Sequence, residues 1–136
     1  MRFMAMVKAD KDYEAGKAPN PDLIAAIGRH TEKMREAGVI LEVGGLLPSS
    51  RGVRLQAKDG AVSVTDGPFA EAKELIGGYA ILNADSKEQA ILFGRQFLQI
   101  HVDVLGPSYE GALEVRQMFE HSEHGTDAPC GSGLSA

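Results

Sequence analysis

The sequence contains one cysteine, Cys130, among its 136 residues. A lone cysteine cannot form an internal disulfide bond, which is typical of proteins from the reducing cytoplasm. The sequence also lacks any run of the roughly 18–20 apolar residues that a membrane-spanning helix requires. We therefore expect a soluble, cytoplasmic protein without a membrane partner.

Positive charge is scarce as well. The chain has 14 lysine and arginine residues against 19 aspartate and glutamate residues, which gives a net charge of −5. A protein that binds nucleic acid directly needs a basic stripe to contact the phosphates, and an anionic membrane surface likewise attracts basic segments. A small basic pocket is compatible with this balance, but direct nucleic-acid binding is not expected.

The common cofactor and metal motifs are absent too. There is no P-loop, no GxGxxG dinucleotide motif, no nucleophile elbow and no cysteine–histidine zinc spacing. His121 and His124 lie near two glutamates, but in a polar segment without a scaffold that would fix ligand geometry. We expect no cofactor and no metal site.

The apolar residues that are present follow the patterns of one domain with one core. Asn20 and Ser86 are good N-cap residues for two helices. An Asp59-Gly60 pair between two short alternating segments predicts a tight hairpin. The expected helices are residues 21–37 and 86–105, and the expected strands are residues 2–9, 39–47, 53–57, 61–65, 78–83 and 112–118.

This order of elements predicts an α+β fold of the ferredoxin-like, split βαβ type, in which two helices cover one face of a single antiparallel sheet. Met4 and Met6 make the second face of the first strand apolar, so we expect a homodimer that packs sheet against sheet. The domain should cover residues 1–120. The polar residues 121–136 should form a disordered tail.

Polar residues are concentrated between Asp66 and Tyr79, where a Gly-Pro turn is followed by an aromatic residue, two glutamates and Lys73. Loops on a rigid scaffold often carry function. Asp66 has two open interpretations: it caps its own turn, or it orients a catalytic histidine or contacts a ligand. Phe69 either packs the loop down or forms a pocket wall.

Lys73 is the cation of this segment and would anchor an anionic ligand. Together with Glu71 and Glu74 it is also typical of a solvated turn. Tyr79 offers an apolar ring with one polar tip.

His30 lies on the apolar stripe of the first helix, together with Leu23, Ile27, Met34 and Ala37. A histidine in such a place is either a neutral core residue with a hydrogen-bond partner or a proton-transfer group that faces a pocket. Both interpretations stay open from the sequence.

The segment between Asp66 and Tyr79 resembles the signature of the DGPF-domain proteins, part of the YCII-related superfamily. The matching positions are residues 66–69, Glu71, Lys73-Glu74 and 77–79. The resemblance covers roughly residues 1–119 and implies a homodimer similar to the dimeric α+β barrels. Related proteins are thought to hold a histidine of the first helix near an aspartate, which corresponds to His30 and Asp66. Some members resemble partners of extracytoplasmic-function sigma factors, which implies a role in regulation.

Our leading hypothesis is a cofactor-independent enzyme that transfers protons on a small polar or anionic molecule. His30 would be the general acid or base and Asp66 its orienting carboxylate. The alternative is a non-catalytic ligand-sensing or protein-binding module in transcription control, associated with a sigma factor. A third hypothesis is a structural dimer. The substrate contacts expected for the enzyme are Phe69, Glu71, Lys73 and Tyr79.

Overall fold

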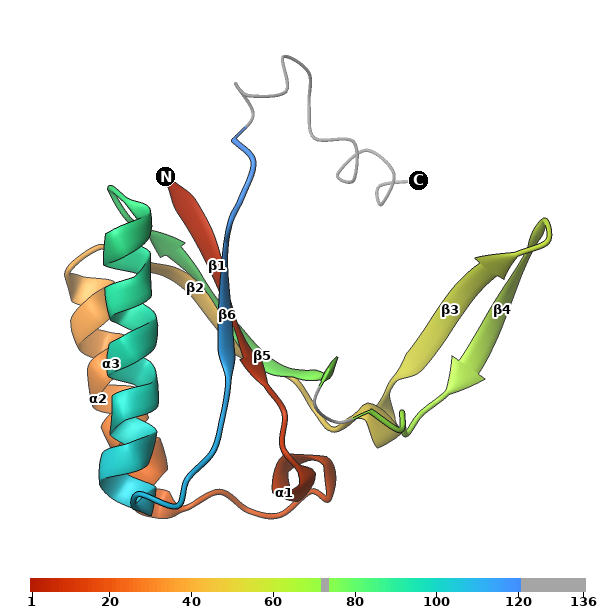
Figure 1. The fold of residues 1–136 in the computed structure, drawn as a ribbon, viewed down its shortest axis with the longest axis horizontal. Coiled ribbons are helices and arrows are strands. Elements are labelled where there is room, and N and C mark those ends of the chain that lie inside the picture. Colours follow the sequence, from red (N-terminus) through yellow and green to blue (C-terminus); the bar gives the residue numbers. More distant parts are fainter. Residues whose placement is uncertain (72–73, 121–136) are drawn as a thin grey trace.

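Alternating apolar residues build a four-stranded antiparallel sheet in the computed structural model, which describes residues 1–71 and 74–120. Its strands are β1 (Arg2–Lys8), β2 (Ile40–Gly45), β5 (Ile76–Asn83) and β6 (Leu113–Gln117), in the order β2-β5-β1-β6. Helices α2 (Pro21–Glu36) and α3 (Lys87–Leu105) cover one face of this sheet (Figure 1). The predicted ferredoxin-like arrangement is therefore confirmed.

Capping residues set the starts of both helices where the sequence predicted them. The Asn20 side chain accepts hydrogen bonds from the N–H groups of Asp22 and Leu23, at 2.8 and 3.3 Å. The Ser86 hydroxyl accepts one from the N–H of Gln89 at 3.2 Å. These bonds satisfy backbone donors that the first helical turn leaves without partners.

The core lies between the sheet and the two helices. Phe3 and Leu82 are register partners on β1 and β5, and they are 2% and 0% exposed. Phe93 of α3 belongs to the same buried cluster. On α2, Leu23 is buried, and the next three positions of the predicted stripe are half-buried. The stripe does not extend to Ala37, which is exposed because it is the C-cap beyond the last helical turn.

The predicted hairpin forms, but it does not join the main sheet. Strands β3 (Val53–Lys58) and β4 (Ala61–Asp66) make a separate two-stranded sheet, the β3–β4 arm, which projects on the side opposite to the helices (Figure 1). Positive φ angles of 51° at Asp59 and 80° at Gly60 fit the predicted turn. The expectation of a single sheet was wrong, because the loops at the base of the arm fold onto each other and turn it away.

Two short helices lie outside the helices and strands that the sequence predicted: α1 (Lys11–Glu14) and the 3₁₀ helix η1 (Ser49–Arg51). Asp10 caps α1 by accepting a 2.7 Å hydrogen bond from the N–H of Tyr13. Helices of one turn carry no apolar periodicity, so the sequence pattern did not reveal them. The predicted tail, residues 121–136, lies outside the described residues.

The second face of the main sheet carries no helix in the described part of the chain (Figure 1). Strand alternation turns Met4 and Met6 of β1, with Tyr79 and Ile81 of β5, to this side, which we call the open face. The predicted apolar character of this face is therefore present on both central strands. The homodimer that was expected to cover it stays a prediction.

Candidate functional site

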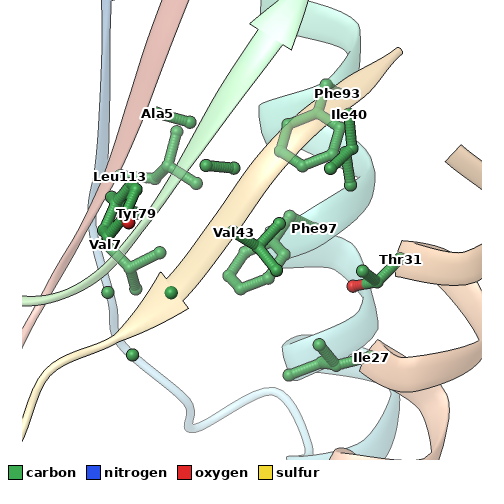
Figure 2. Close-up of a pocket in the computed structure, with 14 residues that line it drawn as sticks. Ala5, Val7, Ile27, Thr31, Ile40, Val43, Tyr79, Phe93, Phe97 and Leu113 are labelled. Atoms are coloured by element: carbon green, nitrogen blue, oxygen red, sulfur yellow. The ribbon is translucent and has the colours of Figure 1, made fainter. Parts of the chain in front are cut away.

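A cavity of about 240 Å³ lies between the sheet and the two helices, on the side away from the open face. Strands β1, β2, β5 and β6 contribute one wall, and α2 and α3 contribute the other (Figure 2). It is lined by Ala5, Val7, Ile27, Thr31, Ile40, Val43, Gly44, Gly45, Gly78, Tyr79, Ala80, Phe93, Phe97 and Leu113.

The lining of this cavity is almost entirely apolar. Phe93 and Phe97 extend from α3, and Val43 extends from β2 (Figure 2). Thr31 and Tyr79 are the lining residues that carry a polar side-chain atom. Ligand cavities of this kind orient an apolar molecule through a small number of polar contacts.

Glycines leave the strand wall of the cavity open. A Cβ atom at Gly45 would meet no heavy atom within 4 Å, so a larger side chain there would extend into the cavity. A Cβ atom at Gly44 would lie 2.7 Å from Cε1 of Tyr79, because the tyrosine ring crosses over β2 at this position. Gly44 therefore marks a close approach of the Tyr79 side chain to the backbone of β2.

Tyr79 links this strand wall with the open face. Its ring lies on the open face, where its hydroxyl donates a 2.7 Å hydrogen bond to Oε2 of Glu42. This hydrogen bond, together with the negative charge of Glu42, raises the pKa of Tyr79 above its ordinary value of 10.0. Tyr79 is therefore a neutral hydroxyl donor near neutral pH, and its position is fixed by Glu42.

His30 lies beside the cavity, at the contact between α2 and α3. Its Nε2 is 3.2 Å from Oε1 of Gln96, and its ring centroid is 5.5 Å from that of Phe93. Its Nδ1 is buried and has no hydrogen-bond partner within residues 1–71 and 74–120. An amide oxygen only accepts, so in this contact Nε2 is the donor, and Nδ1 is left without a hydrogen-bond partner.

The loop after β4 closes the base of the arm. Gly67 donates its N–H to the carbonyl of Gly52 at 2.9 Å, and Phe69 donates its N–H to Oγ of Ser49 at 3.0 Å. A Cβ atom at Gly67 would overlap the carbonyl group of Ser49, so the chain requires glycine there. The Arg54 guanidinium lies 4.2 Å from the centre of the Phe69 ring.

Ser49 is held in turn by Glu14 of α1. The Ser49 hydroxyl and the Ser49 N–H both donate to the Glu14 carboxylate, the N–H at 2.9 Å. The hydroxyl of Tyr13 donates to the Gly77 carbonyl of β5 at 2.8 Å. The helix α1 therefore ties the base of the arm to the main sheet. Sequence analysis missed this connection because its partners are 35 and 64 residues apart.

The structure does not bring the predicted site residues into one cavity. No hydrogen bond or ion pair joins His30 to Asp66 in the described part of the chain, and α2 and the arm lie on opposite sides of the sheet (Figure 1). Asp66 and Glu71 are exposed. Lys73 lies outside the described residues. Tyr79 is the member of the predicted set that lines the cavity.

Sequence analysis also missed Thr31, Glu42 and Gln96. Thr31 is adjacent to His30 on α2, so the helical stripe was a signal for it. Glu42 and Gln96 act through contacts with another element, to Tyr79 and His30 respectively. No local pattern reveals such a partner.

Within the described residues, no group of three or more histidine, cysteine, aspartate or glutamate side chains is arranged to hold a metal ion. None of the described helices combines the length and the hydropathy that crossing a bilayer would require.

Comparison with known proteins gives a family and one uncharacterised relative. Residues 1–97 match the YCII-related domain. "Uncharacterized protein R00369" of Rhizobium meliloti (strain 1021) is 34% identical over 86 residues, which are 63% of this chain and 64% of that protein. The chain therefore spans less than two thirds of the length of this curated relative.

A solved structure, 5-chloro-2-hydroxyhydroquinone dehydrochlorinase from Burkholderia phenoliruptrix AC1100 in complex with 2,5-dihydroxybenzoquinone, is 17% identical with a TM-score of 0.45. The match covers 93% of this chain and 100% of that chain. A similarity at this level carries no argument about activity or substrate.

Proposed function

This chain belongs to the YCII-related domain family, and we propose that it binds a small, mainly apolar molecule in the cavity between the sheet and its two helices. The observation that carries the proposal is the lining, in which two phenylalanine rings and several aliphatic side chains surround one threonine hydroxyl. We further propose that the chain is a DGPF-type member of the family and that it works in the cytoplasm.

The size of the cavity limits the ligand to about one ring. A dry cavity of about 150 Å³ accepts benzene, and pockets for drug-sized ligands begin at about 300 Å³. The volume of about 240 Å³ lies between these values. The lining favours a less polar ligand than the polar or anionic molecule that the sequence suggested. A single-ring phenol, with its hydroxyl group at Thr31, has the required size and chemistry.

Proton transfer by His30 is the catalytic activity that the geometry supports. The Gln96 amide takes the orienting role that the sequence assigned to Asp66, because it fixes the protonated nitrogen of the ring. Nδ1 is left buried and without a partner in the described chain. A buried polar atom without a partner costs free energy, and such a cost is often retained at functional sites. His30 is next to Phe93 of the cavity wall.

Titration with phenol, followed by NMR chemical shifts and calorimetry, tests the proposed binding site. Gly45→Val places a side chain in the cavity, so we expect it to weaken phenol binding by at least about tenfold. Ser63→Val is the matched control, since it adds a similar side chain on an exposed strand of the arm. Equal affinity of both variants and the wild-type protein would exclude the cavity as the site.

Ligand sensing without turnover is a second candidate function. It is favoured because the lining residues carry few reactive groups. The helices contribute one hydroxyl group to the lining, that of Thr31. A sensor would bind the ligand and leave it chemically unchanged, and His30→Gln would retain binding. An enzyme with His30 as its base would lose turnover in the same variant. A sigma factor that co-purifies with the protein would support the sensing role.

A further inference from the structure

We propose that a second cavity, beside the outer strand β6, binds an amphipathic organic anion, namely a carboxylate with an apolar body of up to two rings. This cavity has a volume of about 370 Å³ and lies between β1, β6 and the first turns of α3. It is lined by Phe3, Lys87, Ile91, Val115, Arg116 and Gln117, and we call it the edge cavity. Among the described residues it shares no lining residue with the cavity of the proposed function, so this inference goes beyond that function.

The packing of α3 on β6 leaves the edge cavity open beside the start of the helix. At Gly94 the helix lies so near the strand that a Cβ atom would be 3.1 Å from Cδ2 of Leu113 and 3.7 Å from Cγ2 of Val115. Nearer to the helix start, Ile91 and Lys87 line the edge cavity instead. Strand β6 is the last strand of the main sheet, so no further strand of the described chain covers its outer side.

The deepest part of the edge cavity is apolar. Phe3 is 2% exposed and belongs to the core cluster. Ile91 is 38% exposed and Val115 is half-buried, so a ligand that covers them removes apolar surface from water. The volume of about 370 Å³ exceeds the roughly 300 Å³ at which pockets for drug-sized ligands begin. The edge cavity therefore has room for a two-ring apolar body.

Two cations line the edge cavity without an acidic counterpart. Lys87 comes from α3 and Arg116 from β6, and neither forms an ion pair in the described part of the chain. Glu114 on β6 and Glu120 just beyond it are each paired with a cation of β1, at 3.9 and 3.3 Å. No acidic residue of the described ranges lines the edge cavity itself. Its positive charge is therefore left for a ligand to neutralise.

The polar groups of the lining select a carboxylate. Lys87 is the first residue of α3, where the helix dipole disfavours a cation, and Arg116 adds a second positive charge to the same lining. The Gln117 amide donates one N–H to Sδ of Met1 at 3.6 Å, and its second N–H can donate to a ligand. A carboxylate accepts charge-assisted hydrogen bonds from lysine and arginine and a further bond from the amide. Its apolar body then lies on the apolar part of the lining.

Titration of the full chain with 2-naphthoate, followed by NMR chemical shifts and calorimetry, tests the edge cavity. Two fused rings exceed the space of about one ring between the sheet and the two helices, so this probe separates the two cavities. We expect 2-naphthoate to shift resonances of the edge-cavity residues and to bind at least about tenfold more tightly than the uncharged 2-naphthamide. Gly45→Val, which changes the other cavity, should bind 2-naphthoate like the wild-type protein.

The double variant Lys87→Met with Arg116→Met removes both positive charges and keeps the aliphatic part of each side chain. We expect it to bind 2-naphthoate at least about tenfold more weakly. Lys33→Met with Arg35→Met is the matched control, because it makes the same change in net charge on α2 and should leave the affinity unchanged. All four positions are exposed, so thermal unfolding should report a folded protein in both cases.

Equal affinities of the two double variants would overturn the edge cavity as a binding site. So would an absence of 2-naphthoate binding, or equal affinities for 2-naphthoate and 2-naphthamide. Loss of 2-naphthoate binding in Gly45→Val would place the probe in the other cavity and would overturn the inference as well. Failure of phenol to bind, with 2-naphthoate binding lost only in Lys87→Met with Arg116→Met, would contradict the proposed function and support the edge cavity.

Discussion

Glu42 of strand β2 keeps the hydroxyl of Tyr79 protonated. The Tyr79 ring can lie over β2 because Gly44 has no side chain there. The ring crosses Gly44, and its hydroxyl reaches the carboxylate at 2.7 Å. Both the hydrogen bond and the charge favour the neutral phenol, so the pKa of Tyr79 is raised. A group whose pKa is higher in the folded state stabilises the fold fully below its unfolded value, and this stabilisation is lost as the pH rises through the folded pKa.

Glu42→Gln should lower the pKa of Tyr79 toward 10.0, because it removes the negative charge while it keeps an acceptor. The shift is measured in a protein that also carries Tyr13→Phe and Tyr109→Phe, so that Tyr79 is its one remaining tyrosine. The near-ultraviolet absorbance of the Tyr79 phenolate is recorded during an alkaline titration. Glu32→Gln, on the exposed part of α2, is the control and should leave the titration unchanged. An unchanged titration in Glu42→Gln would contradict the assigned contact.

The two helix histidines also differ at the residue scale. His101 is 8% exposed, its Nδ1 donates to the carbonyl of Phe97 at 2.9 Å, and its ring lies between Phe97 and Tyr109. His30 is half-buried, and its Nδ1 is without a partner in the described chain. The histidine whose buried Nδ1 is satisfied is therefore His101, which is typical of a structural residue, whereas His30 has the unsatisfied atom.

At the scale of elements, the base of the β3–β4 arm explains the Gly-Pro turn that the sequence singled out. Gly67 lies against the Ser49 carbonyl, and its N–H bonds to Gly52. The loop thus contributes geometry, and Asp66 is exposed at the end of β4. The arm can keep its direction only if this contact stays close.

Gly67→Ala should lower the free energy of unfolding by about 1–3 kcal/mol, since the added methyl group overlaps backbone atoms that cannot rotate away. Gly28→Ala is the matched control on the exposed surface of α2, where a Cβ atom meets nothing within 4 Å. It should raise that free energy by about 0.5–1 kcal/mol through helix propensity. Urea denaturation measures both, and a neutral Gly67→Ala would refute the close contact.

At the scale of the whole molecule, the main sheet separates two surfaces. The cavity lies between the sheet and the helices. The open face lies on the other side of the sheet, and the arm projects on that side (Figure 1). Tyr79 is shared, since it lines the cavity and its ring lies on the open face. Ligand binding in the cavity should therefore be independent of substitutions on the open face or the arm, unless a change affects Tyr79.

Val64→Glu should bind phenol with the affinity of the wild-type protein, whereas Gly45→Val should bind it more weakly, because only Gly45 lies on the cavity side of the sheet. Calorimetry of both variants measures the two affinities. If Val64→Glu also lost ligand binding, the two surfaces would be coupled through the sheet. That result would contradict their independence.

Features that depend on neighbouring residues were predictable from the sequence. Asn20 and Ser86 cap helices because their side chains reach N–H groups two or three residues away. Asp59-Gly60 forms its turn because both residues tolerate positive φ. The order of strands and helices then limited the fold to the ferredoxin-like arrangement, which the structure has.

Features that depend on contacts between distant segments were decided by the tertiary structure alone. His30 meets Gln96 across 66 residues, and Ser49 meets Glu14 across 35. The detached arm and the cavity arise in the same way, from loop contacts and from the space left between packed layers. The sequence by itself determined the elements and their order, because helix caps, turns and apolar periods are local. Which side chains meet depends on packing in three dimensions, and no local pattern encodes it.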